Sequence, residues 1–344
     1  MRSESKIIHR IWTKLRPTGQ TPDWLRLGIG DDAAVLRTQY PSHSDRGTTE
    51  LVLSCDAFLE KIHFRVDTVP SGAIGYKALA RATSDLAAMG ATPRFFMLSL
   101  ALPGELSGKW LDSMLTGMSQ AAREFGMVLI GGDTSQNANV VMNLTVGGEV
   151  AVGHALTRAD ARPGDGIYVS GTLGAAQLGL ELMLRGLSRN RQWKKLLEPH
   201  LQPKIQLDLG RWLAEGKKSC AIASSAIDTS DGLSSDLAHI CEASGVKARV
   251  FASQIPQVQI PASLRKHEFD PLQLALHGGE DYQLLFTAPQ EHRIPPSFKG
   301  TLITKIGEIV RGGTTRGRHL IELVDPSGRK SQLAIEGWDS FRGK

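Results

Sequence analysis

The sequence predicts an α/β (α+β) protein of two domains, and three observations support this prediction. Apolar runs typical of strands alternate with helix-like amphipathic runs through both halves of the chain, as expected when sheets and helices pack together. The length of 344 residues exceeds that of a typical single domain. A turn-rich segment at 157–165 follows a long strand-like run, so we expect one domain at 1–152 and a second at 153–344.

The first domain is expected to contain helices and strands in alternation. A short amphipathic helix is predicted within 1–27, followed by a buried strand at 51–53 that ends at Asp56. Apolar residues at helical spacing predict a helix over 71–89, stopped by Gly90, and the same criterion predicts a helix over 109–125. Apolar or alternating runs predict strands at 95–102, 128–130 and 140–152. We expect the second of these three strands to run into a loop at Gly131-Gly132-Asp133.

The second domain is also expected to contain both strands and helices. Short apolar runs predict strands at 166–170, 221–227, 247–252, 282–287 and 302–310. Helical spacing predicts helices at 175–187, 205–215 and 233–244.

Composition excludes several classes of protein. The net charge is +5, but the basic residues are scattered, which argues against nucleic-acid binding and suits an enzyme with anionic substrates. The three cysteines have neither disulfide-framework nor zinc-site spacing. The N-terminus lacks the apolar core of a signal peptide, and the densest apolar stretch, 95–102, is far shorter than a membrane span. We therefore expect a cytoplasmic protein that does not bind membranes.

The acidic residues are the most informative feature of the chain. Many lie in short motifs flanked by Gly, Ser or Thr at the edge of apolar runs: Gly28-Ile29-Gly30-Asp31-Asp32, Ser54-Cys55-Asp56, Ser84-Asp85, Gly131-Gly132-Asp133-Thr134, Asp228-Thr229-Ser230-Asp231-Gly232 and Gly278-Gly279-Glu280-Asp281. If these motifs converge, their carboxylates repel one another unless cations are bound. Mg²⁺ prefers oxygen ligands and shares its coordination shell with phosphates. The motifs therefore predict a magnesium- and nucleotide-dependent enzyme.

Each motif also has a purely structural interpretation. Gly and Asp are common turn formers, Asp56 can end a strand in an Asx turn, and Ser230 or Asp231 can cap a helix. His63, between apolar neighbours, is by itself more typical of a structural histidine. Asp85 is harder to explain in this way, because its carboxylate lies near the negative end of the predicted helix dipole. A bound cation accounts for it better.

Taken in order, these motifs resemble the thiamine-monophosphate kinases, ATP-dependent enzymes of the aminoimidazole ribonucleotide synthetase superfamily. Further matching segments are His63-Phe64, Tyr76-Lys77-Ala78-Leu79-Ala80, Ala155-Leu156-Thr157-Arg158 and the continuation of the Ser84-Asp85 motif through Pro93. The resemblance implies the two-domain fold of that superfamily and a homodimer whose N-terminal sheets pair. It also implies thiamine monophosphate and ATP as substrates, with several Mg²⁺ ions between the two domains.

The resemblance assigns roles to individual residues. The implied magnesium ligands are Asp32, Ser54, Cys55, Asp56, Asp85, Asp133, Asp228 and Asp231. Gly132, Arg158 and Ser230 would contact ATP, and His63, Glu280 and Trp338 would contact thiamine monophosphate. Family members often have Ser or Thr at the position of Cys55, so any metal contact there must come from its backbone. Lys61 also departs from the family pattern.

A direct phosphoryl transfer follows from the chemistry of the implied acceptor. A phosphate monoester is largely dianionic at neutral pH, so no catalytic base is needed, and cations must instead bring two anions together. The alternatives are another ATP-dependent enzyme of the same superfamily or a non-catalytic nucleotide-binding subunit.

Overall fold

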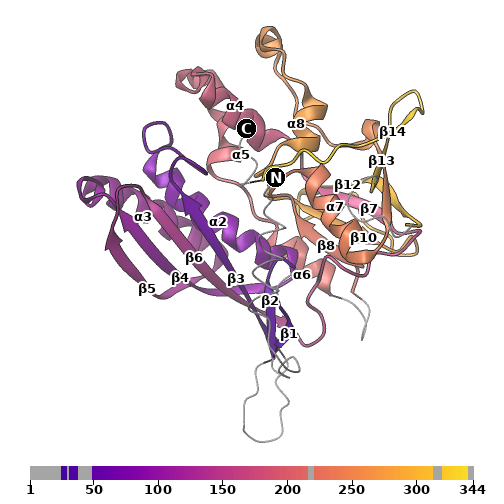
Figure 1. Ribbon diagram of the computed structural model, residues 1–344, viewed down its shortest axis with the longest axis horizontal. Coiled ribbons are helices and arrows are strands. Elements are labelled where there is room, and N and C mark those ends of the chain that lie inside the picture. Colours follow the sequence, from indigo (N-terminus) through magenta and orange to yellow (C-terminus); the bar gives the residue numbers. More distant parts are fainter. Residues whose placement is uncertain (1–24, 29–30, 38–48, 216–220, 313–319, 340–344) are drawn as a thin grey trace, which may run out of the picture.

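Two β-sheets flank a central helix in the computed structural model, which describes residues 25–28, 31–37, 49–215, 221–312 and 320–339 (Figure 1). Residues 25–151 supply the strands of the first sheet, and residues 166–332 supply those of the second. The helix predicted within 1–27 falls almost wholly outside the described residues.

The first sheet has six strands in the order β1-β2-β3-β6-β4-β5. Their bounds are β1 Leu25–Leu27, β2 Ala34–Arg37, β3 Thr49–Leu59, β4 Thr92–Leu102, β5 Val128–Gln136 and β6 Val141–Ala151. Only the pair β4 and β5 is parallel. Helices α2 (Ser71–Ala88) and α3 (Lys109–Phe125) lie on one face of this sheet (Figure 1). The opposite face carries the exposed side chains of Cys55 and Met97.

The second sheet has the order β14-β13-β9-β12-β7-β10-β8, with β11 paired to β12. Its strands are β7 Gly166–Ser170, β8 Ser225–Asp228, β9 Lys247–Phe251, β10 Leu284–Ala288, β11 Ser297–Phe298, β12 Thr301–Val310, β13 Ile321–Val324 and β14 Lys330–Gln332. Only β9 and β13 pair in parallel, so the fold is α+β rather than a wound parallel sheet.

The remaining helices belong to the second half of the chain. They are α4 Ala175–Leu184, α5 Lys194–Leu201, α6 Leu207–Ala214, α7 Leu233–Ser244 and α8 Pro271–His277. Short 3₁₀ helices occur at η1 Gly104–Leu106, η2 Leu187–Arg189, η3 Arg191–Trp193, η4 Ala252–Gln254 and η5 Ala262–His267.

Helix α2 is packed at backbone distance by helices on two sides. A Cβ on Gly75 of α2 would come within 1.9 Å of the Met114 carbonyl oxygen of α3. On the other side, a Cβ on Gly210 of α6 would lie 2.0 Å from the Ala87 carbonyl oxygen of α2. Only glycine allows helix backbones to approach this closely. The largest hydrophobic core accordingly includes side chains from both halves of the chain, with Leu79 and Leu209 among its buried members.

Most predicted elements are confirmed, and two strands correct the interpretation of their acidic residues. The bounds of α2, α3, α7 and β7 agree with the prediction to within one residue. The prediction that a strand ends at Asp56 is wrong, because β3 stays paired with β6 as far as Leu59. The loop predicted at Gly131-Gly132-Asp133 is also wrong, because β5 runs through these residues alongside β4.

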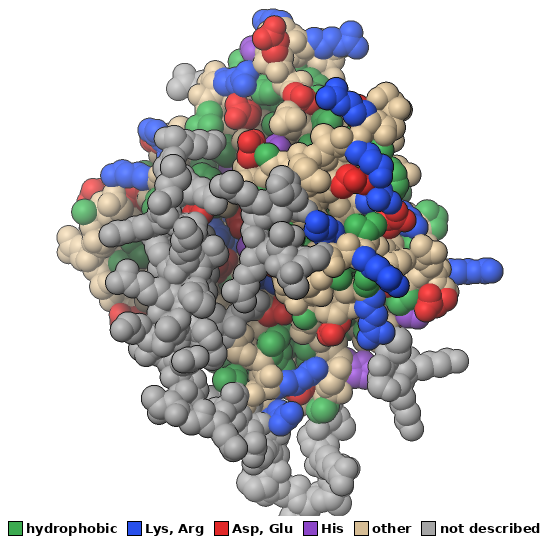
Figure 2. Space-filling view, turned by 45° about the vertical axis from the view of Figure 1, so that its right-hand side comes forward, with side chains coloured by type: hydrophobic (Ala, Val, Ile, Leu, Met, Phe, Trp, Pro, Cys, Tyr) green, Lys and Arg blue, Asp and Glu red, His purple; other side chains and the backbone are tan. Residues whose placement is uncertain are grey.

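None of the helices in the described part of the chain combines the length and apolar composition needed for a membrane crossing. On the face shown in Figure 2, Lys and Arg side chains are interspersed with Asp and Glu. The described part of that face therefore carries no continuous basic stripe.

Candidate active site

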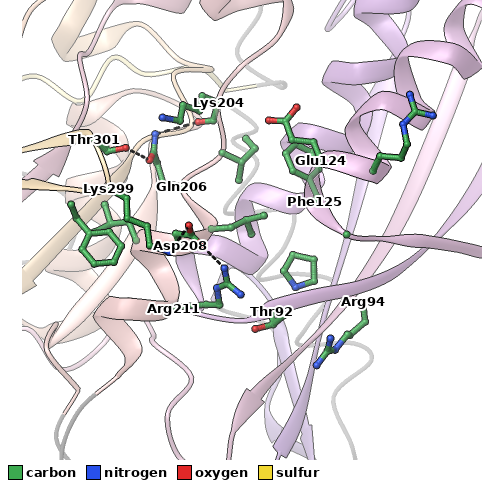
Figure 3. Close-up of a pocket in the computed structure, with 17 residues that line it drawn as sticks. Thr92, Arg94, Glu124, Phe125, Lys204, Gln206, Asp208, Arg211, Lys299 and Thr301 are labelled. Atoms are coloured by element: carbon green, nitrogen blue, oxygen red, sulfur yellow. Dashed lines mark hydrogen bonds and ion pairs between the residues drawn. The ribbon is translucent and has the colours of Figure 1, made fainter.

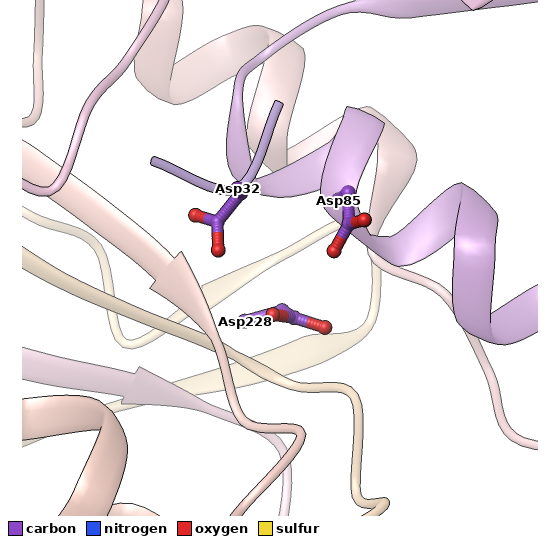
Figure 4. A group of neighbouring side chains, drawn as sticks. All are labelled: Asp32, Asp85 and Asp228. Atoms are coloured by element: carbon purple, nitrogen blue, oxygen red, sulfur yellow. The ribbon is translucent and has the colours of Figure 1, made fainter. Parts of the chain in front are cut away.

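Three predicted metal ligands converge where the two halves of the chain meet. Asp32 lies in the turn before β2, Asp85 in the last turn of α2, and Asp228 at the end of β8. One carboxylate oxygen from each lies within 4.8 Å of the others, and the three side chains point toward one another (Figure 4). We refer to Asp32, Asp85 and Asp228 as the carboxylate cluster.

The chemistry of the cluster fits a hard divalent cation. Oδ2 of Asp32 and Oδ2 of Asp228 are both buried and have no hydrogen-bond partner of normal geometry among the described residues. The Ser84 hydroxyl lies close enough to Asp228 to lower its pKa, but burial and Asp32 outweigh it. Burying a polar atom without a partner costs free energy. A bound cation would supply a partner for both oxygens. Carboxylate oxygens are preferred ligands of Mg²⁺.

Electrostatics lead to the same conclusion. Burial, followed by the charges of Asp56, Asp228 and Asp32, raises the pKa of Asp85 well above its usual range. Burial and then the charge of Asp32 raise the pKa of Asp228 to about 7. Carboxylates with such raised pKa values are held apart from water and close to like charges, which is the arrangement that a bound cation stabilises.

Two polar residues of strand β3 contact α2 next to the carboxylate cluster. Ser54 donates a hydrogen bond to the Asp85 carboxylate, and Arg81 of α2 donates to Oδ2 of Asp56 at 2.9 Å. The side chain of Cys55 lies on the other face of the sheet, with Sγ 2.9 Å from Oδ1 of Asn143 on β6. Only the backbone of Cys55 therefore faces the same side as Ser54 and Asp56.

The adjacent residues Asp31 and Asp32 have different surroundings. The Asp31 carboxylate accepts the backbone N–H of Arg158 at 3.0 Å, and burial followed by the charge of Asp32 raises its pKa to about 6. Asp32 instead faces the cluster and accepts hydrogen bonds from the Arg158 guanidinium, including one from Nε at 3.2 Å. The structure thus places Arg158, predicted to contact ATP, beside a predicted metal ligand.

The last two acidic motifs form adjoining loops. The Glu280 N–H donates to the Ser230 carbonyl at 2.9 Å, and the Trp338 N–H donates to the Asp231 carbonyl at 3.0 Å. The charge of Asp231 also contributes, after burial and Asp32, to the raised pKa of Asp228. Ser230, Asp231, Glu280 and Trp338 are therefore neighbours of the carboxylate cluster or of each other.

His63 lies near the same site as a neutral donor. Its Nδ1 accepts the Leu59 N–H at 3.0 Å, so the ring proton is on Nε2, and the ring stacks on Phe58. Burial and the charge of Arg81 lower its pKa to about 4, while Glu280 and Asp56 act in the opposite direction. At neutral pH, His63 therefore presents an uncharged N–H donor.

Gly132 and Asp133 are not brought to the cluster. Both lie on the exposed edge strand β5, and three strand spacings, about 14 Å, separate β5 from β3. A Cβ on Gly132 would come within 1.9 Å of the Leu98 carbonyl oxygen, so strand packing alone requires glycine there.

Sequence reasoning assigned no role to three basic residues of the site, Lys77, Arg81 and His200. Lys77 and Arg81 precede Asp85 by eight and four residues on α2, so all three lie on one helix face. Charged residues at four-residue intervals in an otherwise apolar helix could have indicated that these side chains face one site. His200 lies on α5, which was not predicted, and nothing in the sequence points to its partners.

A separate hollow of about 460 Å³ lies between α3 and α6 (Figure 3). Its lining includes Arg94, Glu124, Lys204 and Asp208, but none of the predicted site residues. Asp208 forms ion pairs with both Arg211 and Lys299 at its edge.

Comparison with known proteins agrees with this geometry. Residues 30–150 match the family described as AIR synthase related protein, N-terminal domain. The thiamine-monophosphate kinase of Salmonella typhimurium is 39% identical over 310 residues, or 89% of this chain and 87% of its own length. That of Escherichia coli K12 is also 39% identical and covers 98% of both chains.

A solved structure extends the match to the whole fold. The structure of AaThiL complexed with AMPPCP and TMP has a TM-score of 0.82 at 28% identity and covers 99% of each chain. Identity of this extent, together with the superfamily fold and the carboxylate cluster, establishes that the chain belongs to the thiamine-monophosphate kinase family of enzymes.

Proposed function

We propose that the enzyme transfers the γ-phosphate of ATP directly to the phosphate of thiamine monophosphate, giving thiamine diphosphate and ADP as the last step of thiamine diphosphate synthesis. The convergence of Asp32, Asp85 and Asp228, with two buried oxygens that have no described partner, carries this proposal. The kinase names of the relatives, and a related structure complexed with AMPPCP and TMP, support the choice of substrates.

The proposed site combines three groups of residues. Asp32, Ser54, Cys55, Asp56, Asp85, Asp133, Asp228 and Asp231 would hold several Mg²⁺ ions. Gly132, Arg158 and Ser230 would bind ATP, and His63, Glu280 and Trp338 would bind thiamine monophosphate. Mg²⁺ bound there would neutralise phosphate charge and align an in-line transfer.

The chain's own residues orient the reactants rather than exchange protons with them. The acceptor phosphate has a second pKa near 6, so it is already ionised at neutral pH. His63 is neutral there, because burial lowers its pKa to about 4, and it offers Nε2–H as a donor. Arg158 lies beside Asp32, where its guanidinium can also reach a phosphate. No protein nucleophile is required.

The two halves of the chain divide these tasks. Residues 1–152 form the ATP- and magnesium-binding and dimerisation domain of the proposal, and 153–344 form the domain that completes the site. Asp228 comes from the second half and faces Asp32 and Asp85 across the junction. Ser230 and Glu280, also from the second half, are joined to each other by a backbone hydrogen bond.

We also propose that the enzyme is a homodimer formed through its N-terminal sheets. Strand β5 is exposed along its whole length, and Val128, Leu129 and Ile130 are each more than half exposed. A long apolar edge strand is unfavourable in water unless another chain covers it. We propose that in this dimer Asp133 of one subunit serves the cluster of its partner, because three strand spacings separate it from β3 of its own chain.

The proposed location is the cytoplasm. Cys55 and Cys241 are both free thiols in the described part of the chain. Free thiols are typical of proteins in a reducing compartment.

The direct test is turnover of thiamine monophosphate with ATP and Mg²⁺ by the intact protein and by two variants. Asp228→Asn and Asp231→Asn keep side-chain size but remove the charge that holds a hard cation. We expect each to lose about a thousandfold in kcat, equivalent to roughly 4 kcal/mol of transition-state stabilisation. Asp67→Asn, which alters an exposed ion pair with Arg65, is the control. Near-normal turnover by Asp228→Asn would contradict the metal role, and no turnover by the intact protein would contradict the function.

A further inference from the structure

A buried lysine and a buried histidine converge on the Glu280 carboxylate. Nζ of Lys77 lies 2.8 Å from Oε2 of Glu280, and Nδ1 of His200 lies 3.3 Å from the same oxygen. Lys77 comes from α2, His200 from α5, and Glu280 from the loop between α8 and β10. The side chains of Lys77 and His200 are each 4% exposed, whereas that of Glu280 is 23% exposed.

This arrangement is not explained by fold stability alone. Burying a lysine carries a large desolvation penalty, and replacing a buried ion pair with apolar residues of similar volume is often neutral or stabilising. Ile74 and Ala80, three residues before and after Lys77 on the same face of α2, belong to the hydrophobic core, so an apolar side chain would suit the position. An ammonium group there requires another reason.

The backbone of Glu280 is also held in an unusual conformation. Its φ is 68°, in the left-handed region that non-glycine residues rarely adopt, and its N–H donates to the Ser230 carbonyl. The preceding Gly279 has no room for a Cβ, which would lie 2.4 Å from the Ser230 carbonyl oxygen. Strain of this kind is typical of functional sites.

The two oxygens of Glu280 therefore differ. Oε2 is held by Lys77 and His200, whereas Oε1 has no hydrogen-bond partner among the described residues, and the side chain remains partly accessible. His63 is close enough for Glu280 to affect its charge state. A fixed, ionised carboxylate beside a neutral N–H donor suits a flat cationic ring.

We propose that Lys77 and His200 are positioning residues, which hold Glu280 as an oriented carboxylate for the positively charged heteroaromatic ring of the substrate. This inference rests on the proposed function, in which Glu280 contacts thiamine monophosphate. Lys77 and His200 touch neither the ring nor the phosphates and act only through Glu280.

The charges around Glu280 predict a pH signature. Burial would raise the pKa of Glu280, but Lys77 and His200 outweigh burial and hold the pKa well below its usual range. The other charged or titratable groups that interact with it are Arg81, His63, Asp281 and Tyr282. Without the Lys77 ammonium, burial dominates, and Glu280 takes up a proton as the pH falls.

The test uses Lys77→Met in the full-length enzyme, with KM and kcat measured between pH 5.5 and 8.5. At pH 7 we expect KM for thiamine monophosphate to rise about tenfold, the size of one charge-assisted hydrogen bond, and to rise further on acidification. KM for ATP and kcat should change less than about twofold, because the phosphate end of the site is untouched. The control is Lys299→Met, which removes a surface ion pair with Asp208.

Two further variants keep the test decisive if Lys77→Met folds poorly. His200→Asn retains the ammonium and should raise the same KM by only about threefold, without a new pH dependence. Glu280→Gln should raise KM, and adding Lys77→Met to it should have little further effect, because the two residues act as one unit. A pH-independent KM in Lys77→Met, or equal losses for ATP and thiamine monophosphate, would overturn the positioning role. Absence of turnover in the unmodified enzyme would instead reject the proposed function.

Discussion

The carboxylate cluster and strand β5 both carry predicted magnesium ligands, but the structure treats them in opposite ways. Asp32, Asp85 and Asp228 are assembled from three elements of one chain and lie within 4.8 Å of one another. Asp133 lies on an exposed edge strand, with Ser99 of β4 as its cross-strand neighbour. The difference shows that one chain assembles Asp32, Asp85 and Asp228 but leaves Asp133 away from them. Under the proposed dimer, Asp133 would serve the site of the second chain.

The largest effect we expect comes from mixing two inactive variants. Asp133→Asn and Asp228→Asn should each lose at least about a hundredfold in kcat. If Asp133 serves the partner's cluster, a mixed dimer has one intact site, so an equimolar, re-equilibrated mixture should recover up to about a quarter of normal activity. Activity assays of the mixture, with each variant alone as the control, measure this recovery. No recovery would place Asp133 with its own chain or outside the site.

A charge on the exposed edge strand should weaken association of the chains. Ile130→Asp places a carboxylate in the apolar segment of β5, and we expect the dimer dissociation constant to rise about a hundredfold or more. Sedimentation velocity over a range of protein concentrations measures the change. Leu302→Asp, at an exposed apolar position on the second sheet, should leave association unchanged. If the unmodified protein is a monomer, the proposed dimer through the N-terminal sheets is wrong.

His63→Asn should have a smaller effect, confined to one substrate. We expect KM for thiamine monophosphate to rise and kcat to stay within about tenfold, the scale of one hydrogen bond. Because burial and Arg81 lower the pKa of His63 to about 4, its ring stays neutral above that pH. The kcat/KM profile of the unmodified enzyme between pH 6 and 8 should therefore lack an inflection from this residue. A collapse of kcat at unchanged KM would make His63 part of the chemistry.

Ligand binding should produce the smallest change, a rise in thermal stability. Melting temperatures should increase from EDTA, to Mg²⁺, to Mg²⁺ with a non-hydrolysable ATP analogue, because a cation relieves repulsion in the carboxylate cluster. A ligand at a hundredfold excess over its Kd adds about 2.7 kcal/mol to the free energy of unfolding. Calorimetric scans measure the order, and identical midpoints would mean that the cluster binds no cation.

The sequence predicted helices more accurately than it predicted the surroundings of the acidic residues. The spacing of apolar residues and a stopping glycine locate α2 and α3, because both signals are local. Whether β3 ends at Asp56 depends on how far β6 pairs with it, which is set by residues about ninety positions away. For the same reason, the sequence could not show that Gly131-Gly132-Asp133 continues a strand.

The site shows the same division between local and distant signals. The acidic motifs placed Asp32, Asp85 and Asp228 within a larger predicted set of metal ligands, because each motif lies at the edge of an apolar run. They could not show that Arg81 pairs with Asp56, or that Lys77 and His200 share one oxygen of Glu280. Such pairs join residues that are distant in the sequence, and only the packing of α2 between two sheets brings them together.

The close packing of α2 against α3 and α6 fixes the position of this helix along its own axis. With backbones in contact at Gly75 and Gly210, α2 cannot slide along its axis without steric overlap. A rise of 1.5 Å per residue then fixes Lys77 and Asp85 about 12 Å apart along that axis. In the proposed function, recognition of the substrate ring would lie near one end of this interval and phosphate binding near the other. A phosphorylated compound too short to cover it would engage one end and leave the other unfilled, so the enzyme would select its acceptor by length as well as by charge.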